Sequence, residues 1–255
     1  MIDHRRDDSM NLNASNTGTW RLFSLVYGMK YGLSRRDRMR VLEGLVPYTR
    51  PLDYRLKTPY GLFHCPDVAS AYQFKPRWEM PVREIICSLD DGLFVDVGAN
   101  LGFYSVLACN GGNRVVSVEA NSAVASCLKE NLENNCSSGR YTVHNVAASN
   151  EDGIAHFDIP NRSGVGHISE SGPVVQTRSL DSLLNGQVPN IVKIDAEGAE
   201  PEIMKGMKST LSHGPKIIFE ALDAGALDRS TQMLAPFSYT IQRIDATNYV
   251  ASPPK

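Results

Sequence analysis

An acidic residue and two glycines follow one another closely at the end of an apolar run. Residues 93–97 have the pattern of a buried strand, and Asp96 in this run precedes Gly98 and Gly102. The glycines let the backbone turn tightly and approach a ligand, and a helix expected over 102–110 would direct its free N–H groups toward that ligand. The pattern therefore predicts a cofactor-binding turn between a strand and a helix.

The glycine spacing and the charge of Asp96 indicate which cofactor binds. A dinucleotide-binding turn has the pattern G-x-G-x-x-G, whereas this turn is G-x-x-x-G and has Asn100 where the central glycine would stand. A carboxylate before the turn repels a phosphate and attracts an ammonium group. Glu119 ends the next expected strand, where an acid accepts hydrogen bonds from ribose hydroxyls. We therefore expect S-adenosylmethionine (SAM), which carries both a ribose and an ammonium group.

Four motifs resemble those of the FkbM family of SAM-dependent methyltransferases, over roughly residues 78–222. They are the glycine turn at 94–102, Val118-Glu-Ala-Asn121, the segment 128–135, and Ile191-Val-Lys-Ile-Asp-Ala-Glu-Gly-Ala-Glu200 followed by Met204-Lys-Gly206. The block around Asp195 is the most specific, because many methyltransferase families share the glycine turn. Family members usually have Val at the position of Ala196 and Pro at that of Ala120, and both differences are small and apolar.

The resemblance implies an α/β, Rossmann-like class I methyltransferase fold, with a mostly parallel seven-stranded sheet and helices on both faces. The alternation of apolar strands and helices from residue 82 onward agrees with it. We expect strands near 93–97, 114–119, 141–146, 190–195 and 215–221, helices at 102–110, 122–134, 200–211 and 224–234, and an antiparallel hairpin near 237–252. Residues 153–175 contain four glycines and two prolines and are expected to form an irregular insertion that contacts the substrate.

Three parts are expected along the chain: a flexible start (1–19), a helix-and-strand extension or lid (20–80), and the methyltransferase domain (81–255). An amphipathic helix in the extension, with four arginines following it, permits membrane-surface contact by residues 20–40. Its two interior glycines favour a packing or lid helix instead. Five prolines between residues 46 and 77 predict short strands and turns over the cofactor site.

Nine residues are predicted to bind the cofactor, because ligands of open parallel sheets bind outside the carboxyl ends of the strands. Asn145 and Ala147 lie where the third strand ends, at the position that meets the adenine in similar enzymes. An ordinary turn cap is an equal alternative for Asn145. The predicted set is Asp96, Gly98, Ala99, Asn100, Gly102, Glu119, Ala120, Asn145 and Ala147.

Carboxylates at the ends of two later strands are the catalytic candidates. Methyl transfer from a sulfonium is an in-line displacement, so the protein must align the acceptor and remove its proton. We predict catalytic roles for Asp195 and Glu220, which end two strands, and for Glu197 at the mouth of the site. Crowding of such acids raises a carboxyl pKa toward neutrality, as a base requires. Glu200 is expected to support the helix start or the cofactor, and Lys193 to form an ion pair with one of the acids.

Two alternatives for this chemistry stay open. His167, in the expected insertion, could replace a carboxylate as the base, although a solvated loop histidine is favoured. A metal could bind the acids through oxygen ligands, but no ligand pattern is complete, so we predict none.

Composition and charge limit the partners of the chain. Its 255 residues are 42% hydrophobic, enough to bury a sizeable core. The net charge of −2 divides into +4 for residues 1–90 (14 Lys+Arg, 10 Asp+Glu) and −6 for residues 91–255 (12 against 18). An acidic catalytic part without a basic stripe argues against a nucleic-acid substrate. Five cysteines without a C-x-x-C pair suggest neither disulfides nor zinc, and no signal peptide or spanning segment is evident, so we expect a cytoplasmic protein.

The expected function is O-methyl transfer from SAM to a hydroxyl of a sugar residue or of a glycosylated or polyketide natural product, as the resemblance implies. Enzymes that methylate base amines share an Asp/Asn-Pro-Pro-aromatic turn after the fourth strand, whereas this chain has Asp195-Ala-Glu-Gly198. An oxygen acceptor is therefore favoured. A nicotinamide-dependent oxidoreductase and a non-catalytic SAM-binding protein on the same fold are the alternatives.

Overall fold

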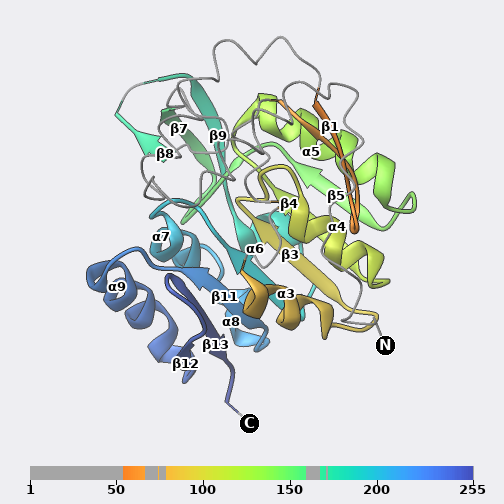
Figure 1. Ribbon diagram of the computed structural model, residues 1–255. Helices are drawn as coiled ribbons and strands as arrows, with labels where there is room; N and C mark the ends of the chain where they lie inside the picture. Colours follow the sequence, from red (N-terminus) through yellow and green to blue (C-terminus); the bar gives the residue numbers. More distant parts are fainter. Residues whose placement is uncertain (1–53, 67–73, 75–78, 159–166, 171, 255) are drawn as a thin grey trace, which may run out of the picture.

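The computed structural model (Figure 1) describes residues 54–66, 74, 79–158, 167–170 and 172–254. Predictions for residues 1–53, which include the flexible start and the amphipathic helix, lie outside the described residues, and the division of the chain at residue 81 stays a prediction. Within the described ranges, no helix has both the length and the apolar character needed to span a membrane.

A seven-stranded sheet with the strand order β12-β13-β11-β10-β3-β4-β5 forms the centre of the molecule. Its strands are β3 (Leu93–Val97), β4 (Arg114–Val118), β5 (Tyr141–His144), β10 (Ile191–Ile194), β11 (Lys216–Glu220), β12 (Thr240–Arg243) and β13 (Asn248–Ser252). The first five are parallel, while β13 pairs antiparallel with both β11 and β12. This confirms the Rossmann-like class I methyltransferase fold and the closing hairpin that the sequence predicted.

Helices cover both faces of this sheet, and Figure 1 shows α3 and α4 in front of β3. One face carries α3 (Met80–Cys87), α4 (Phe103–Asn110) and α5 (Ser122–Asn135), and the other carries α6 (Leu180–Leu184), α7 (Glu200–Lys205), α8 (Lys208–Ser212) and α9 (Ala224–Leu234). Phe94, Ile191 and Ile218 pack under α3, α4 and α5, whereas Val95 and Val192 pack under the other four helices. Alternate residues of each strand thus enter opposite cores, as expected for a parallel sheet buried on both sides.

The single helix expected over 200–211 is instead two helices, α7 and α8. Gly206 ends α7, and a Cβ atom at this position would lie 2.2 Å from the carbonyl oxygen of Ser149. The carboxylate of Asp181 then accepts a hydrogen bond from the N–H of Thr210 at the start of α8 (2.8 Å). The close approach of another strand and a cap from a distant residue therefore break the helix, and neither is visible in local sequence.

The prediction of an irregular insertion at 153–175 is wrong for the described residues of this range. They belong to a second sheet with the order β6-β9-β7-β8. Its strands are β6 (Ala147–Ser149), β7 (Gly153–Asp158), β8 (His167–Ser169) and β9 (Val174–Ser179). Phe157 in β7 is 7% exposed, while Ile154 on the opposite face is 75% exposed. This alternation is the signature of a half-buried strand, and the neighbouring glycines obscure it in the sequence.

The strands predicted between residues 46 and 77 are confirmed as a hairpin of β1 (Tyr54–Thr58) and β2 (Gly61–Cys65). The hairpin is held by α5, where the fully buried Asn131 accepts a hydrogen bond from the N–H of His64 (2.6 Å) and donates to the carbonyl oxygens of His64 (3.1 Å) and Leu101 (2.9 Å). Its position over the cofactor site stays a prediction.

The cysteine pattern predicted that the chain forms no disulfide, and this prediction is wrong. Cys109 at the end of α4 is bonded to Cys136 directly after α5, with their Cα atoms 5.8 Å apart. Two helix ends, 27 residues apart in sequence, meet at the same edge of the sheet, which cysteine spacing alone cannot reveal. Disulfides are rare in reducing compartments, so the cysteines no longer support a cytoplasmic location, which stays a prediction.

We predict that Asn131→Ala lowers the free energy of unfolding by about 2–3 kcal/mol, because it leaves buried backbone groups of β2 and of the glycine turn without partners. Urea denaturation measures the change. Asn134→Ala, at an exposed position of the same helix, is the matched control and should change stability by less than about 0.5 kcal/mol. Equal effects of the two substitutions would contradict this role of Asn131.

Candidate active site

The carboxyl ends of the central strands bring the predicted site residues to one edge and one face of the sheet. Ile191 and Ile218 pack under α3, α4 and α5. Lys193 and Glu220 stand two residues later on the same strands and therefore face the same helices. Asp96 on β3 also faces them and accepts a hydrogen bond from α4. The site thus lies between the strand ends and the first turns of α3 and α4.

The glycine turn has the geometry that requires glycine. Gly98 has φ 73°, and a Cβ atom there would lie 1.8 Å from the carbonyl oxygen of Asp195. Gly102 has φ 82°, and a Cβ atom there would lie 2.5 Å from Leu128. The N–H groups of Gly98 and Ala99 both donate to the carbonyl oxygen of Val118 (2.9 and 3.1 Å). These two amides therefore hold the turn against β4, and the first turn of α4 is left to face a ligand.

Glu119 fixes the same turn from the end of β4. Its carboxylate accepts hydrogen bonds from the N–H of Asn100 and the N–H of Asn121, both at 2.9 Å. The side chain is buried, and burial raises its pKa to about 7, although these backbone donors oppose the rise. Each carboxylate oxygen keeps a further lone pair. Glu119 can therefore accept from ribose hydroxyls while it shapes the turn, which fits its predicted role.

The other predicted adenine-side residues are placed close by. The Nδ2 atom of Asn145 donates to the carbonyl oxygens of Glu119 (2.8 Å) and Ala120 (3.1 Å), which is the turn-cap alternative for this residue. Ala147 begins β6, is buried and pairs with Thr177. Contacts of Ala120, Asn145 and Ala147 with the cofactor stay predictions.

Asp96 offers an acceptor for a positively charged ligand. It is 1% exposed, and its Oδ2 atom accepts from the hydroxyl of Ser105 (2.6 Å), which is also 2.8 Å from the hydroxyl of Ser117. Its Oδ1 atom has no hydrogen-bond donor among the described residues. A buried carboxylate oxygen without a donor is costly, and the ammonium of SAM would supply one. The residues present therefore fit the expected cofactor.

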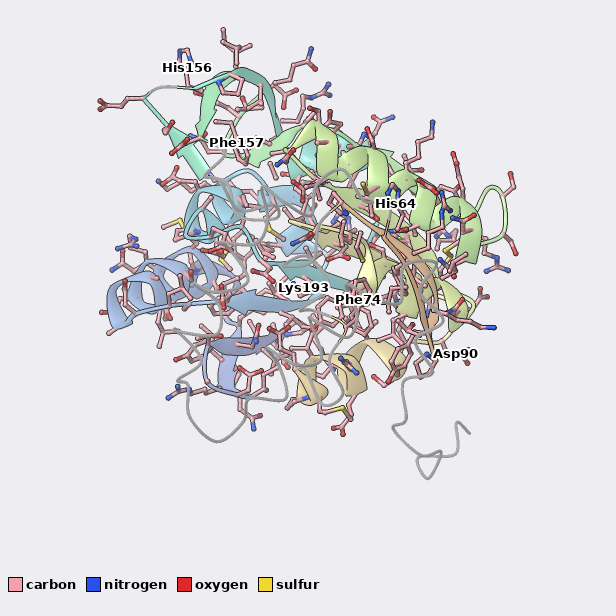
Figure 2. The ribbon with its side chains drawn as sticks, turned by 45° about the horizontal axis from the view of Figure 1, so that its top comes forward. His64, Phe74, Asp90, His156, Phe157 and Lys193 are labelled. Carbon is pink, nitrogen blue, oxygen red and sulfur yellow. A yellow bond between two sulfur atoms is a disulfide. The ribbon has the colours of Figure 1, made fainter. Side chains whose placement is uncertain are left out.

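Lys193 is a buried cation at the centre of the molecule, as Figure 2 shows. Its Nζ atom lies 2.8 Å from Oδ2 of Asp195, which confirms the predicted ion pair, and 4.8 Å from the ring centroid of Tyr104. Burial disfavours its charge, but the carboxylates of Asp195, Asp96 and Glu79 outweigh burial and raise the pKa of Lys193. The ammonium of Lys193 thus interacts electrostatically with all three of these carboxylates.

Glu220 has the properties of a base near neutral pH. Burial raises the pKa of its carboxyl group to about 7, and the negative charges of Asp195 and Glu197 add to the rise. The hydroxyl of Thr247 and the charge of Lys193 act in the opposite direction. The structure therefore brings the three predicted catalytic carboxylates within electrostatic reach of one another.

Glu200 acts on the backbone. It is 2% exposed, and its Oε1 atom accepts hydrogen bonds from the N–H groups of Ala196 (2.9 Å) and Gly198 (3.2 Å). It therefore holds the loop after β10 in shape at the start of α7. The side chain of His167 is not among the described ones, so its role as an alternative base stays a prediction.

Sequence reasoning missed Glu79 and Tyr104. Glu79 directly precedes α3 and accepts a hydrogen bond from the hydroxyl of Tyr104 in the first turn of α4. The sequence offers one signal for Glu79, which is an acid just before a helix start that contains Pro81. This signal does not reveal Tyr104 as its partner. In the described part of the chain, no group of three or more His, Cys, Asp or Glu side chains is arranged to hold a metal ion.

A sequence model of the family described as "Methyltransferase FkbM domain" matches residues 96–234, more than half of the chain. A curated relative, the hexuronic acid methyltransferase AglP of Haloferax volcanii, is 30% identical over 137 residues. The similar segment is 51% of this chain and 56% of AglP, so the chain spans about half the length of the curated relative that it matches.

Two solved structures resemble the chain at low identity. The precorrin-6y C5,15-methyltransferase of Geobacter metallireducens is 16% identical, with a TM-score of 0.45 over 69% of this chain and 88% of that chain. The tRNA (uracil-54, C5)-methyltransferase of Pyrococcus abyssi, in complex with S-adenosyl-L-homocysteine, is 14% identical, with a TM-score of 0.49 over 78% of this chain and 44% of that chain.

We predict that Asp96→Asn weakens SAM binding at least about tenfold, because the neutral amide removes the negative charge that the buried carboxylate offers to the ammonium. Isothermal titration calorimetry with SAM measures the change. Asp90→Asn, at an exposed site on the periphery in Figure 2, removes the same charge far from the turn and should leave the affinity within about twofold. Unchanged affinity in Asp96→Asn would exclude this carboxylate as the ammonium acceptor.

Proposed function

Because the chain belongs to the FkbM methyltransferase family, we propose that it transfers a methyl group from SAM to a hydroxyl oxygen of a saccharide, with Glu220 as the base. Family membership supports SAM-dependent methyl transfer as the activity, with SAM as the cofactor. The observation that carries the proposal is a half-buried carboxylate with a pKa of about 7 beside the ion pair that the buried Lys193 forms with the partly exposed Asp195 at the strand ends. No observation favours a nicotinamide cofactor or a non-catalytic role.

Three features of the chain would hold the cofactor. The Oδ1 atom of Asp96 would accept from its ammonium, the carboxylate of Glu119 from its ribose hydroxyls, and Gly98 would keep the turn free of side chains. When bound, SAM supplies the electrophilic methyl group. The residues of the chain then have to orient the acceptor oxygen and receive its proton.

Glu220 is the proposed proton acceptor, because a base works best when its pKa is close to the working pH. Asp195 is held at 2.8 Å by the ammonium of Lys193, so its carboxylate is engaged in this ion pair and is less suited to accept a proton. We assign Asp195 to keeping Lys193 in place and to raising the pKa of Glu220. Glu197 adds negative charge at the mouth and is proposed to contact the acceptor.

The proposed acceptor class follows from the relative and from the chemistry of the site. AglP acts on a hexuronic acid by its name, which supports a saccharide acceptor, and a glycosylated or polyketide natural product carries the same hydroxyl group. A carboxylate base suits an alcohol, which must lose its proton on methylation. The lid role of residues 20–80, their membrane-surface contact, and the exclusion of nucleic acid stay proposals.

We predict that Glu220→Gln retains SAM affinity within about twofold and lowers methyl transfer at least about a hundredfold, because the amide cannot accept the proton. Transfer is measured with methyl-labelled SAM and a saccharide and metabolite fraction of the host, followed by identification of the labelled product. Glu202→Gln, on the exposed side of α7, is the matched control. Full activity of Glu220→Gln would remove Glu220 from the role of base.

A wild-type protein that binds SAM but labels no saccharide or glycosylated product would refute the acceptor class.

We predict that the transfer rate at saturating SAM rises with pH around a midpoint near 7, because Glu220 must be ionised to accept a proton. Thr247→Val should move this midpoint to higher pH, since the lost hydroxyl hydrogen bond stabilises the carboxylate. Thr231→Val, at an exposed site on α9, is the control and should not move it. A midpoint that is the same in Thr247→Val and wild type would exclude Glu220 as the titrating group.

A further inference from the structure

We propose that Glu79 and Tyr104 are positioning residues that hold the ammonium of Lys193 between the cofactor-side carboxylate Asp96 and the acceptor-side carboxylate Asp195. The naming of these two sides rests on the proposed function. Glu79 lies outside the segment 96–234 that matches the family, so the family match does not account for this arrangement.

Glu79 has an unusual backbone and does not cap its own helix. It stands at the N-cap of α3 with φ 44° and ψ 48°, a left-handed conformation that non-glycine residues rarely adopt. An acidic N-cap residue normally accepts a hydrogen bond from the first turn of its helix, yet this side chain makes no such bond. It accepts from the hydroxyl of Tyr104 instead. The strained backbone thus serves a contact to a neighbouring helix.

Tyr104 contacts two different partners, one through its hydroxyl and one through its ring. The hydroxyl is fixed by Glu79, and the ring lies under Lys193 with its centroid 4.8 Å from Nζ, within the range of a cation–π interaction. The side chain is 8% exposed, and its ring makes an edge contact with Phe103 at 5.2 Å. A buried ring that is fixed at the hydroxyl cannot turn away from the ammonium.

Lys193 is surrounded by carboxylates from three elements. Asp195 follows β10, Asp96 lies on β3, and Glu79 precedes α3, and all three favour the charged form of Lys193. Among the residues that the structure describes, the bond to Asp195, at 2.8 Å, is the one direct contact of Lys193 with a carboxylate. A flexible lysine among several acids needs a further restraint to keep one position, and the ring of Tyr104 provides it.

The test compares four variants with the wild type: Tyr104→Phe, Glu79→Ala, Glu79→Gln, and the double variant of Tyr104→Phe with Glu79→Ala. Tyr104→Phe keeps the ring and removes the hydroxyl, and Glu79→Gln keeps an oxygen that can accept from it. Glu84→Gln, at an exposed position of α3, is the control. The first readout is hydrogen exchange of the Lys193 ammonium in ¹⁵N-lysine NMR spectra, assigned with Lys193→Met, and the second is the kcat for methyl transfer at saturating SAM.

We expect the ammonium hydrogens of Lys193 to exchange at least about tenfold faster in Tyr104→Phe and Glu79→Ala, and kcat to fall about tenfold, because both variants release the ring. The double variant should be no worse than either single one, since the two residues act as a unit. Glu79→Gln and Glu84→Gln should stay within about twofold of the wild type.

Three outcomes would overturn the proposal: unchanged ammonium exchange in both Tyr104→Phe and Glu79→Ala, multiplicative loss of kcat in the double variant, or equal loss in Glu79→Gln and Glu79→Ala. Thermal unfolding of each variant identifies losses of kcat that result from poor folding. If Glu79→Ala folds poorly, the conservative variants Tyr104→Phe and Glu79→Gln decide whether the positioning role holds. The exchange measurement needs no acceptor. It therefore tests the positioning role even if methyl transfer to saccharides, and with it the proposed function, fails.

Discussion

The burial of the Lys193 ammonium is the constraint on which the site depends. A lysine that is 1% exposed loses its hydration, at a cost of several kcal/mol unless nearby groups compensate. The carboxylate of Asp195 at 2.8 Å and the ring of Tyr104 supply direct contacts, and Asp96 adds a charge from the neighbouring strand. Lys193 stands opposite Asp96 in the parallel register of β10 and β3, so the register of the central sheet places cation and acid on neighbouring strands.

The same cation separates the roles of two carboxylates that look equivalent in sequence. Asp195 and Glu220 both end apolar strands and lie at the same edge of the sheet. Asp195 is paired with the ammonium, while Glu220 is partly buried, feels the negative charge of Asp195 and has a pKa of about 7. We therefore propose that environment, and not residue type, makes Asp195 a charge partner and Glu220 the base, as in other enzymes with two carboxylates.

Local sequence predicted the parts of the molecule that depend on local structure. The strand that carries Asp96, the turn at Gly98 and the neighbouring strand ends that bring Asp195 and Glu220 together follow from periodicity and from the rule that parallel strands end at one edge. The second sheet was missed because its strands are short and lie among glycines. The Cys109–Cys136 pair and the contact of Glu79 with Tyr104 were missed because both depend on how helix ends meet in three dimensions.

The proposed acids of both sides of the site lie inside the segment 96–234 that matches the family, whereas two residues that act on the acceptor side lie outside it. The proposed cofactor residues, from Asp96 to Glu119, lie inside the segment that matches the family. Glu79 before this segment and Thr247 after it both act on the acceptor-side acids, Glu79 through Tyr104 and Lys193, and Thr247 directly on Glu220. Cofactor binding imposes the same demands on every family member, whereas each acceptor requires its own surface and its own base strength. Residues outside the shared segment can therefore adjust the acceptor chemistry without disturbing the turn that we propose to bind SAM.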